Sequence, residues 1–132
     1  MGAVFVTRKI PEEGPAALRA AGHEVMVSEK DGPLTHDELI AALTEKQYEA
    51  VVCDLDDKID DGILDAAGTQ CKIFANYAVG FDNFDLRAAK ERGVAMTNTP
   101  GVLTDTVAEH AFALVLAIAR RIPEADRFTR AG

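Results

Sequence analysis

The residues best suited to bind a small ligand lie in the loop of residues 76–85, which follows a short apolar run. This loop reads NYAVGFDNFD. A glycine such as Gly80 lets the backbone turn so that consecutive N–H groups face one anion, and a small carboxylate can be held in this way without a basic side chain. The alternative is an ordinary strand-to-helix turn in which Asp82 or Asn83 caps the helix.

A second polar loop precedes the long apolar segment near the C-terminus. Residues 97–105 read TNTPGVLTD and follow another short apolar run. Because ligands bind at the carboxyl ends of the strands in doubly wound sheets, both loops are candidates for one site. Taken alone, the second loop also fits a plain connection that ends in a helix N-cap.

Three acidic residues, Asp54, Asp56 and Asp57, follow a third apolar run. They could bind a metal or accept a phosphoryl group, as in response-regulator receiver domains. Such domains also need an acidic pair after the first strand and a lysine after the fifth. The corresponding positions here hold Arg8-Lys9 and Asn98-Thr99. The sequence therefore favours a solvated acidic turn over a metal or phosphoacceptor site.

The histidines and cysteines form no metal-ligand pattern, and no metal site is predicted. His23 opens a predicted strand and His36 lies inside a capping box, so both are expected to be solvated. His110 lies in the apolar segment, where packing or an interface is favoured over catalysis. Cys53 and Cys71 are expected to be buried near strand ends rather than reactive.

The composition is typical of a soluble globular domain. Of the 132 residues, 48% are hydrophobic and 27% are charged, and the net charge is −8 at pH 7. An acidic surface repels phosphate backbones and anionic lipids, which argues against nucleic-acid and membrane binding. The longest apolar stretch, residues 107–119, is too short to span a bilayer, and the first residues do not resemble a signal peptide. These features predict a cytoplasmic protein.

Apolar runs alternate with helical patterns along the chain. Helix signals include a capping box at Thr35 and Glu38 and terminating glycines at positions 22, 68 and 93. Right-handed crossovers join such strands into a parallel sheet. The sequence thus predicts an α/β fold, a flavodoxin-like doubly wound sheet in the order 2-1-3-4-5. FMN binding is not expected, because residues 7–11 lack the Ser/Thr- and Gly-rich loop that FMN needs. The five predicted strands are residues 3–7, 23–28, 50–53, 72–76 and 94–97.

The last predicted helix runs from Thr104 or Thr106 to Arg121 and differs from the others. Residues 111–119 are apolar on every side, whereas a helix that covers one face of a small sheet needs only one apolar stripe. We therefore expect this helix to meet a second domain or a partner subunit.

Residues 76–85 and 92–121, which read NYAVGFDNFD and RGVAMTNTPGVLTDTVAEHAFALVLAIARR, strongly resemble the D-isomer-specific 2-hydroxyacid dehydrogenases. The resemblance is greatest to the glyoxylate/hydroxypyruvate reductase branch. It implies that the backbone of Val79 and Gly80 hydrogen-bonds the carboxylate of a 2-oxo acid, that Leu55 lies against the substrate, and that Thr104 lies near the nicotinamide.

The same resemblance implies a division of the chain. Residues 1–100 would form the substrate-binding domain. Residues 101–132 would form a hinge and an interdomain helix, through which a homodimer assembles over residues 104–121. In the family a later Rossmann domain binds NAD or NADP and supplies an arginine and a histidine paired with a carboxylate. No glycines here are spaced Gly-x-Gly. The sequence therefore predicts no catalytic residue in this chain and no turnover by it alone.

Two other functions stay open. One is a non-catalytic ligand-binding or dimerisation module of the same fold. The other is a receiver-like domain, which would be labelled by acetyl phosphate at Asp54. The sequence does not distinguish glyoxylate from hydroxypyruvate as substrate or NAD from NADP as cofactor.

Overall fold

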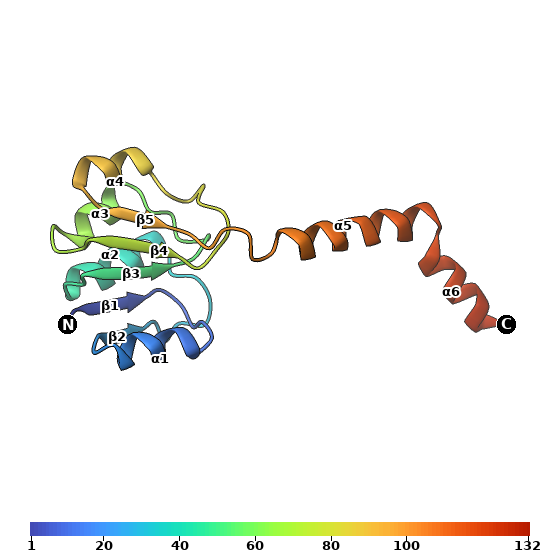
Figure 1. Cartoon of the computed structure of the whole chain (residues 1–132), viewed down its shortest axis with the longest axis horizontal. Coiled ribbons are helices and arrows are strands. Elements are labelled where there is room, and N and C mark those ends of the chain that lie inside the picture. The colour runs from blue at the N-terminus through green and yellow to red at the C-terminus, as the bar shows by residue number, and fades with distance from the viewer. The chain divides into compact units, whose positions relative to one another are not determined.

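The computed structural model describes residues 1–132 and divides the chain into two compact units, Met1–Thr99 and Pro100–Gly132. Each unit is described by itself below. The first unit contains a five-stranded sheet with its helices, and the second contains two helices (Figure 1).

The sheet of the first unit is parallel throughout, with the strand order β2-β1-β3-β4-β5 (Figure 1). This confirms the predicted α/β fold and its strand order. The register pairs Val52 with Ala75, and Ala75 in turn with Thr97, so the chain leaves β3, β4 and β5 at the same edge. The strands are β1 (Ala3–Val6), β2 (Glu24–Val27), β3 (Ala50–Cys53), β4 (Ile73–Asn76) and β5 (Ala95–Thr97).

Four helices connect these strands, and local signals explain where most of them begin and end. Thr35 and Glu38 form the predicted capping box at the start of α2. Gly93 ends α4 in the left-handed conformation, with φ 66°, which glycine adopts without a steric cost. The alternative in which Asp82 or Asn83 caps this helix is wrong, because the Asp85 side chain accepts the capping hydrogen bond from Ala88 N–H. The helices are α1 (Glu13–Ala20), α2 (His36–Glu45), α3 (Asp61–Ala67) and α4 (Leu86–Arg92).

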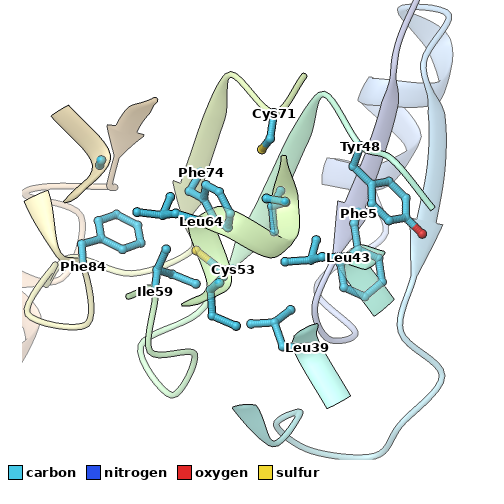
Figure 2. Packing of buried hydrophobic residues seen from close by; sticks show 14 of the residues in the cluster. Phe5, Leu39, Leu43, Tyr48, Cys53, Ile59, Leu64, Cys71, Phe74 and Phe84 are labelled. Atoms are coloured by element: carbon cyan, nitrogen blue, oxygen red, sulfur yellow. The ribbon is translucent and has the colours of Figure 1, made fainter. Parts of the chain in front are cut away.

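One face of the sheet carries the hydrophobic core, which Figure 2 shows from close by. Strands β3 and β4 both alternate half-buried with buried residues, so that Val51 and Phe74 point into this core. Helices α2, α3 and α4 contribute apolar side chains to it, whereas α1 contributes none. Burying a large aliphatic or aromatic side chain is worth about 1.5–3 kcal/mol. The core thus fixes the strand ends from which the candidate loops emerge.

The second unit consists of α5 (Thr104–Ala119) and α6 (Ile122–Ala131). The predicted helix is too long by two residues, because the chain turns at Arg121, which has φ 52°. Helix α6, which the sequence analysis did not predict, then begins at Ile122 and has Pro123 in its first turn, where proline is well tolerated. No residue of α5 or α6 is buried. None of the helices combines the length and apolarity that crossing a membrane requires.

Candidate functional site

The loop after β4 contains a row of backbone N–H groups that have no partner within the chain. Tyr77 N–H donates to the Cys53 carbonyl and ties the start of the loop to β3. By contrast, the N–H groups of Val79, Gly80 and the neighbouring residues 78 and 81 donate no hydrogen bond within the protein. Unpaired amide N–H groups at the carboxyl edge of a parallel sheet can donate hydrogen bonds to a bound anion.

Three consecutive carbonyl oxygens of the same loop, those of residues 78–80, are fixed by hydrogen bonds. Each of them accepts a hydrogen bond from a residue at the end of β4 or just after β5. These bonds run from Thr99 N–H to the Ala78 oxygen at 2.8 Å, from Asn98 Nδ2 to the Val79 oxygen at 2.7 Å, and from Asn76 Nδ2 to the Gly80 oxygen at 2.9 Å.

Holding these carbonyls also orients the amides. The chain contains no cis peptide bond, and in a trans peptide unit the C=O and the N–H point in opposite directions. The Val79 carbonyl shares a peptide unit with the Gly80 N–H, so Asn98 directs that N–H away from itself. The Ala78 carbonyl and the Val79 N–H are related in the same way. In each of these peptide units the carbonyl acceptor is therefore occupied, and the N–H on the opposite side of the unit has no partner within the chain.

Leu55 lies against this loop. It follows β3, its side chain is 48% exposed, and its Cδ2 atom lies 3.3 Å from where a β-carbon on Gly80 would stand. Gly80 has no left-handed φ, so the space beside Leu55 rather than the backbone conformation favours glycine here. The structure thus brings together Leu55, Val79 and Gly80, three of the residues that the sequence analysis selected.

Asn83 joins the loops after β3 and β4, a role that the sequence analysis missed. Its Nδ2 donates to the carbonyl oxygens of Asp54 at 3.1 Å and Asp57 at 3.0 Å. Its Oδ1 accepts from Asn76 Nδ2 at 3.0 Å. Every asparagine of the chain, at positions 76, 83 and 98, therefore donates to a carbonyl of these two loops. The signal available in the sequence was that all three lie at or after the ends of the last two strands.

The prediction of a solvated acidic turn is wrong for Asp57. Its side chain is 2% exposed, and Oδ2 accepts hydrogen bonds from the Thr7 hydroxyl at 2.6 Å and from Asp54 N–H at 2.9 Å. Arg8 lies 3.7 Å from Asp54 and 3.1 Å from Asp56, and its single positive charge offsets part of the negative charge of the turn. No group of acidic, histidine or cysteine side chains has the geometry of a metal site. The acidic turn after β3 is thus joined by hydrogen bonds and ion pairs to the residues that follow β1.

The histidines and cysteines lie apart from this loop. Cys53 and Cys71 are buried free thiols as predicted, and burial raises the pKa of both. His36 keeps an exposed side chain, but its Nε2 lies 3.1 Å from Asp60, the cap of α3. His23 is half-buried rather than solvated, and its Nδ1 has no hydrogen-bond partner. None of these residues adds a catalytic group to the loop.

Thr104 belongs to the second unit, where it is the first residue of α5 and is exposed. The residue before it, Leu103, occupies the N-cap position and makes no side-chain capping bond. The first turn of α5 therefore also keeps backbone N–H groups without a side-chain partner.

Comparison with known proteins places the whole chain in one family. Residues 4–125 match the model of the D-isomer specific 2-hydroxyacid dehydrogenase, catalytic domain. A glyoxylate reductase of Thermofilum pendens is 45% identical over 129 residues, which cover 98% of this chain and 37% of that protein. A glyoxylate reductase of Thermococcus kodakarensis is 44% identical, with coverage of 98% and 38%.

A solved structure shows the same relationship. The TT0316 protein from Thermus thermophilus superposes with a TM-score of 0.84 at 38% identity, over 98% of this chain and 40% of that one. This chain thus spans well under half the length of the relatives that it matches. On the match over residues 4–125, the chain belongs to the D-isomer specific 2-hydroxyacid dehydrogenase family.

Proposed function

We propose that this chain is the substrate-binding part of a reductase that converts a small 2-oxo acid, of the glyoxylate or hydroxypyruvate type, to the D-2-hydroxy acid with NADH or NADPH. The N–H groups of Val79 and Gly80 bind the substrate carboxylate, and Leu55 lies against the rest of the substrate. The observation that carries this proposal is the row of unpaired amides beside three held carbonyls.

Backbone amides suit this task in an acidic protein. With a net charge of −8, the chain repels a free anion at long range, so short-range donors must do the binding. A hydrogen bond to a charged group contributes about 1.5–3 kcal/mol. Two such bonds, less the entropy of association, correspond to a dissociation constant on the order of millimolar or weaker. We therefore expect this chain alone to bind the substrate carboxylate weakly. Tighter binding would require a cationic side chain from another domain.

The residues of this chain do not fit a dinucleotide site. None of its glycines are spaced Gly-x-Gly, and the loop after β1 carries Arg8, whose side chain pairs with Asp54 and Asp56. We assign no hydride or proton transfer to residues 1–132. The proposed contribution toward a nicotinamide is limited to Thr104, and the rest of the NAD(P) site would come from a Rossmann domain outside these residues.

A second candidate function, a non-catalytic binding or dimerisation module, is favoured by the surface of α5. Its large apolar side chains are all exposed within the chain, and an apolar surface of this kind marks an interaction site. We propose that the segment of residues 104–121, which contains α5, links two domains and forms the interface of a homodimer. The cytoplasmic location stays a prediction from the sequence. The exposed residues are Val107, Phe112, Leu114, Val115, Leu116 and Ile118.

One assay separates the two functions. The oxidation of NADH or NADPH is followed by absorbance with glyoxylate or hydroxypyruvate as substrate. We expect no turnover by residues 1–132 and substrate-dependent turnover when a family Rossmann domain follows Gly132. Turnover by the chain alone would refute the proposed division of labour. A fused protein that binds the 2-oxo acid but never oxidises the cofactor would favour the non-catalytic module.

A further inference from the structure

We infer that Asn98 is a positioning residue for the carboxylate-binding loop. Its side-chain amide holds the peptide unit between Val79 and Gly80 in the one orientation that presents the Gly80 N–H to a ligand. Asn76 holds the following peptide unit in the same way. The inference rests on the proposed function, because it concerns how the same loop binds its ligand.

Asn98 and Thr99 donate hydrogen bonds to two adjacent carbonyl oxygens of the loop after β4. Asn98 directly follows β5, which pairs with β4 through the neighbours Thr97 and Ala75. Its Nδ2 lies 2.7 Å from the Val79 oxygen, and the next N–H of the chain lies 2.8 Å from the Ala78 oxygen. The segment after β5 therefore runs along the loop after β4. The sheet itself sets the position of these two donors.

The asparagine amide prevents the most damaging rearrangement of the loop. A peptide unit that rotates by half a turn exchanges its N–H for its C=O. At Val79 and Gly80 this rotation would place a carbonyl oxygen against the carboxylate, where the two would repel each other. The hydrogen bond from Asn98 opposes the rotation because the Val79 oxygen would lose its donor.

Asn98 also strengthens the donor that it orients. Hydrogen bonds in a chain polarise one another, so a peptide unit whose C=O already accepts a bond has a more acidic N–H. Here the chain runs from Asn98 through the Val79 carbonyl to the Gly80 N–H and on to the carboxylate. An aspartate at position 98 would do the opposite. An ionised aspartate cannot donate a hydrogen bond to the Val79 oxygen, and it would add a negative charge beside the bound anion.

Asn76 anchors the other end of the loop and is itself held. It is 2% exposed, donates to the Gly80 oxygen at 2.9 Å and donates to Asn83 Oδ1 at 3.0 Å. Asn98 is only half-buried and makes this one side-chain hydrogen bond. Substitution at Asn98 should therefore leave the fold intact, and Asn98 is the better residue to test.

The test is an NMR titration of the 132-residue chain with sodium glycolate, the carboxylate that glyoxylate reduction yields. Glycolamide, which lacks the charge, is the ligand control. In the wild-type chain we expect saturable shifts of the Val79 and Gly80 amide signals. In Asn98→Ala we expect at least about tenfold weaker binding and a changed Val79 carbonyl carbon shift, with an unchanged unfolding temperature to within a few degrees. Asn98→Asp should bind more weakly still.

Thr97→Ala is the matched protein control, because Thr97 is one residue away, exposed, and makes no side-chain hydrogen bond. Its glycolate affinity should equal that of the wild-type chain. If the wild-type chain shows no glycolate-dependent shift at Val79 or Gly80, the proposed function fails and this inference falls with it. If the wild-type chain binds and a folded Asn98→Ala variant binds equally well, only the positioning role is overturned.

A measurement on the wild-type chain keeps the inference falsifiable even if the variants unfold. Scalar coupling across the hydrogen bond, from Asn98 Nδ2 to the Val79 carbonyl carbon, should be detectable in the free chain. Absence of that coupling in a folded, ligand-free chain would overturn the inference.

Discussion

The Cδ2 atom of Leu55 lies 3.3 Å from the position that a β-carbon on Gly80 would occupy. The loops after β3 and β4 thus meet where the sequence predicts a substrate site. A side chain at position 80 would have to push Leu55 aside, and Leu55 can yield because half of its surface is free.

Substitution of Gly80 should therefore affect binding more than folding. For Gly80→Ala we expect a loss of stability of about 1 kcal/mol or less and weaker glycolate binding, because Leu55 moves toward the ligand. Gly80→Val should impair binding further. Gly14→Ala on α1 is the matched control, since a β-carbon there meets its nearest neighbour, Ile10, at an ordinary 3.5 Å. Urea unfolding and NMR titration measure the two effects. Equal binding by Gly80→Val and wild type would remove Gly80 from the site.

The buried Asp57 should matter for stability. In Asp57→Ala the Thr7 hydroxyl and the Asp54 N–H lose their shared acceptor. An unsatisfied buried donor costs about 1–3 kcal/mol, so for the two donors we expect a loss of about 2–6 kcal/mol in the free energy of unfolding. Asp57→Asn keeps an acceptor oxygen and should cost less. Both values come from urea unfolding. Comparable losses in the two variants would show that the hydrogen bonds do not matter.

The capping box at α2 predicts a pH dependence. Hydrogen bonds from the Lys30 ammonium and from the Thr35 N–H lower the pKa of Glu38 from 4.5 to about 2. A pKa that is depressed in the folded state stabilises the protein above the unfolded value, and this stabilisation is lost as the pH falls through the folded value. Glu38→Gln should therefore show a flatter fall in unfolding free energy between about pH 4.5 and pH 2 than wild type. Parallel curves would contradict the assignment.

The apolar surface of α5 predicts self-association. Phe112 and Ile118 are 70% and 77% exposed in the chain. If α5 forms the proposed homodimer, Phe112→Glu and Ile118→Glu should shift the mass measured by light scattering from dimer to monomer. Lys90→Glu, an exposed change of charge on α4, should leave the dimer intact. A monomeric wild-type chain at high micromolar concentration would contradict the proposal.

Most of the framework could be predicted from the sequence because its signals are local. The runs at positions 50–53 and 72–76 predict β3 and all of β4, the second with one extra residue at its start, and the Thr35 capping box marks the start of α2. Right-handed crossovers then leave few alternatives to the observed strand order. Leu55 and Gly80, which lie far apart in the sequence, were paired only through the family resemblance.

The missed features depend on where side chains point in three dimensions. Asparagine is a common helix cap, yet the side chain of Asn83 donates to carbonyls of the loop after β3. Asp85 caps α4 instead. Asp57 lies in a sequence that is typical of an exposed turn, yet it is buried and accepts a hydrogen bond from the hydroxyl of Thr7, which follows β1. Such pairings join residues 26 to 50 positions apart, and no periodicity within one segment reports them.

The most direct test of the carboxylate site is a crystal structure of this chain soaked with oxamate, a stable analogue of a small 2-oxo acid. We expect one carboxylate within hydrogen-bond distance of both Val79 N and Gly80 N, with Leu55 against the ligand and the three held carbonyls unmoved. A carboxylate bound elsewhere, or a loop whose Val79 carbonyl has turned toward the ligand, would contradict the account.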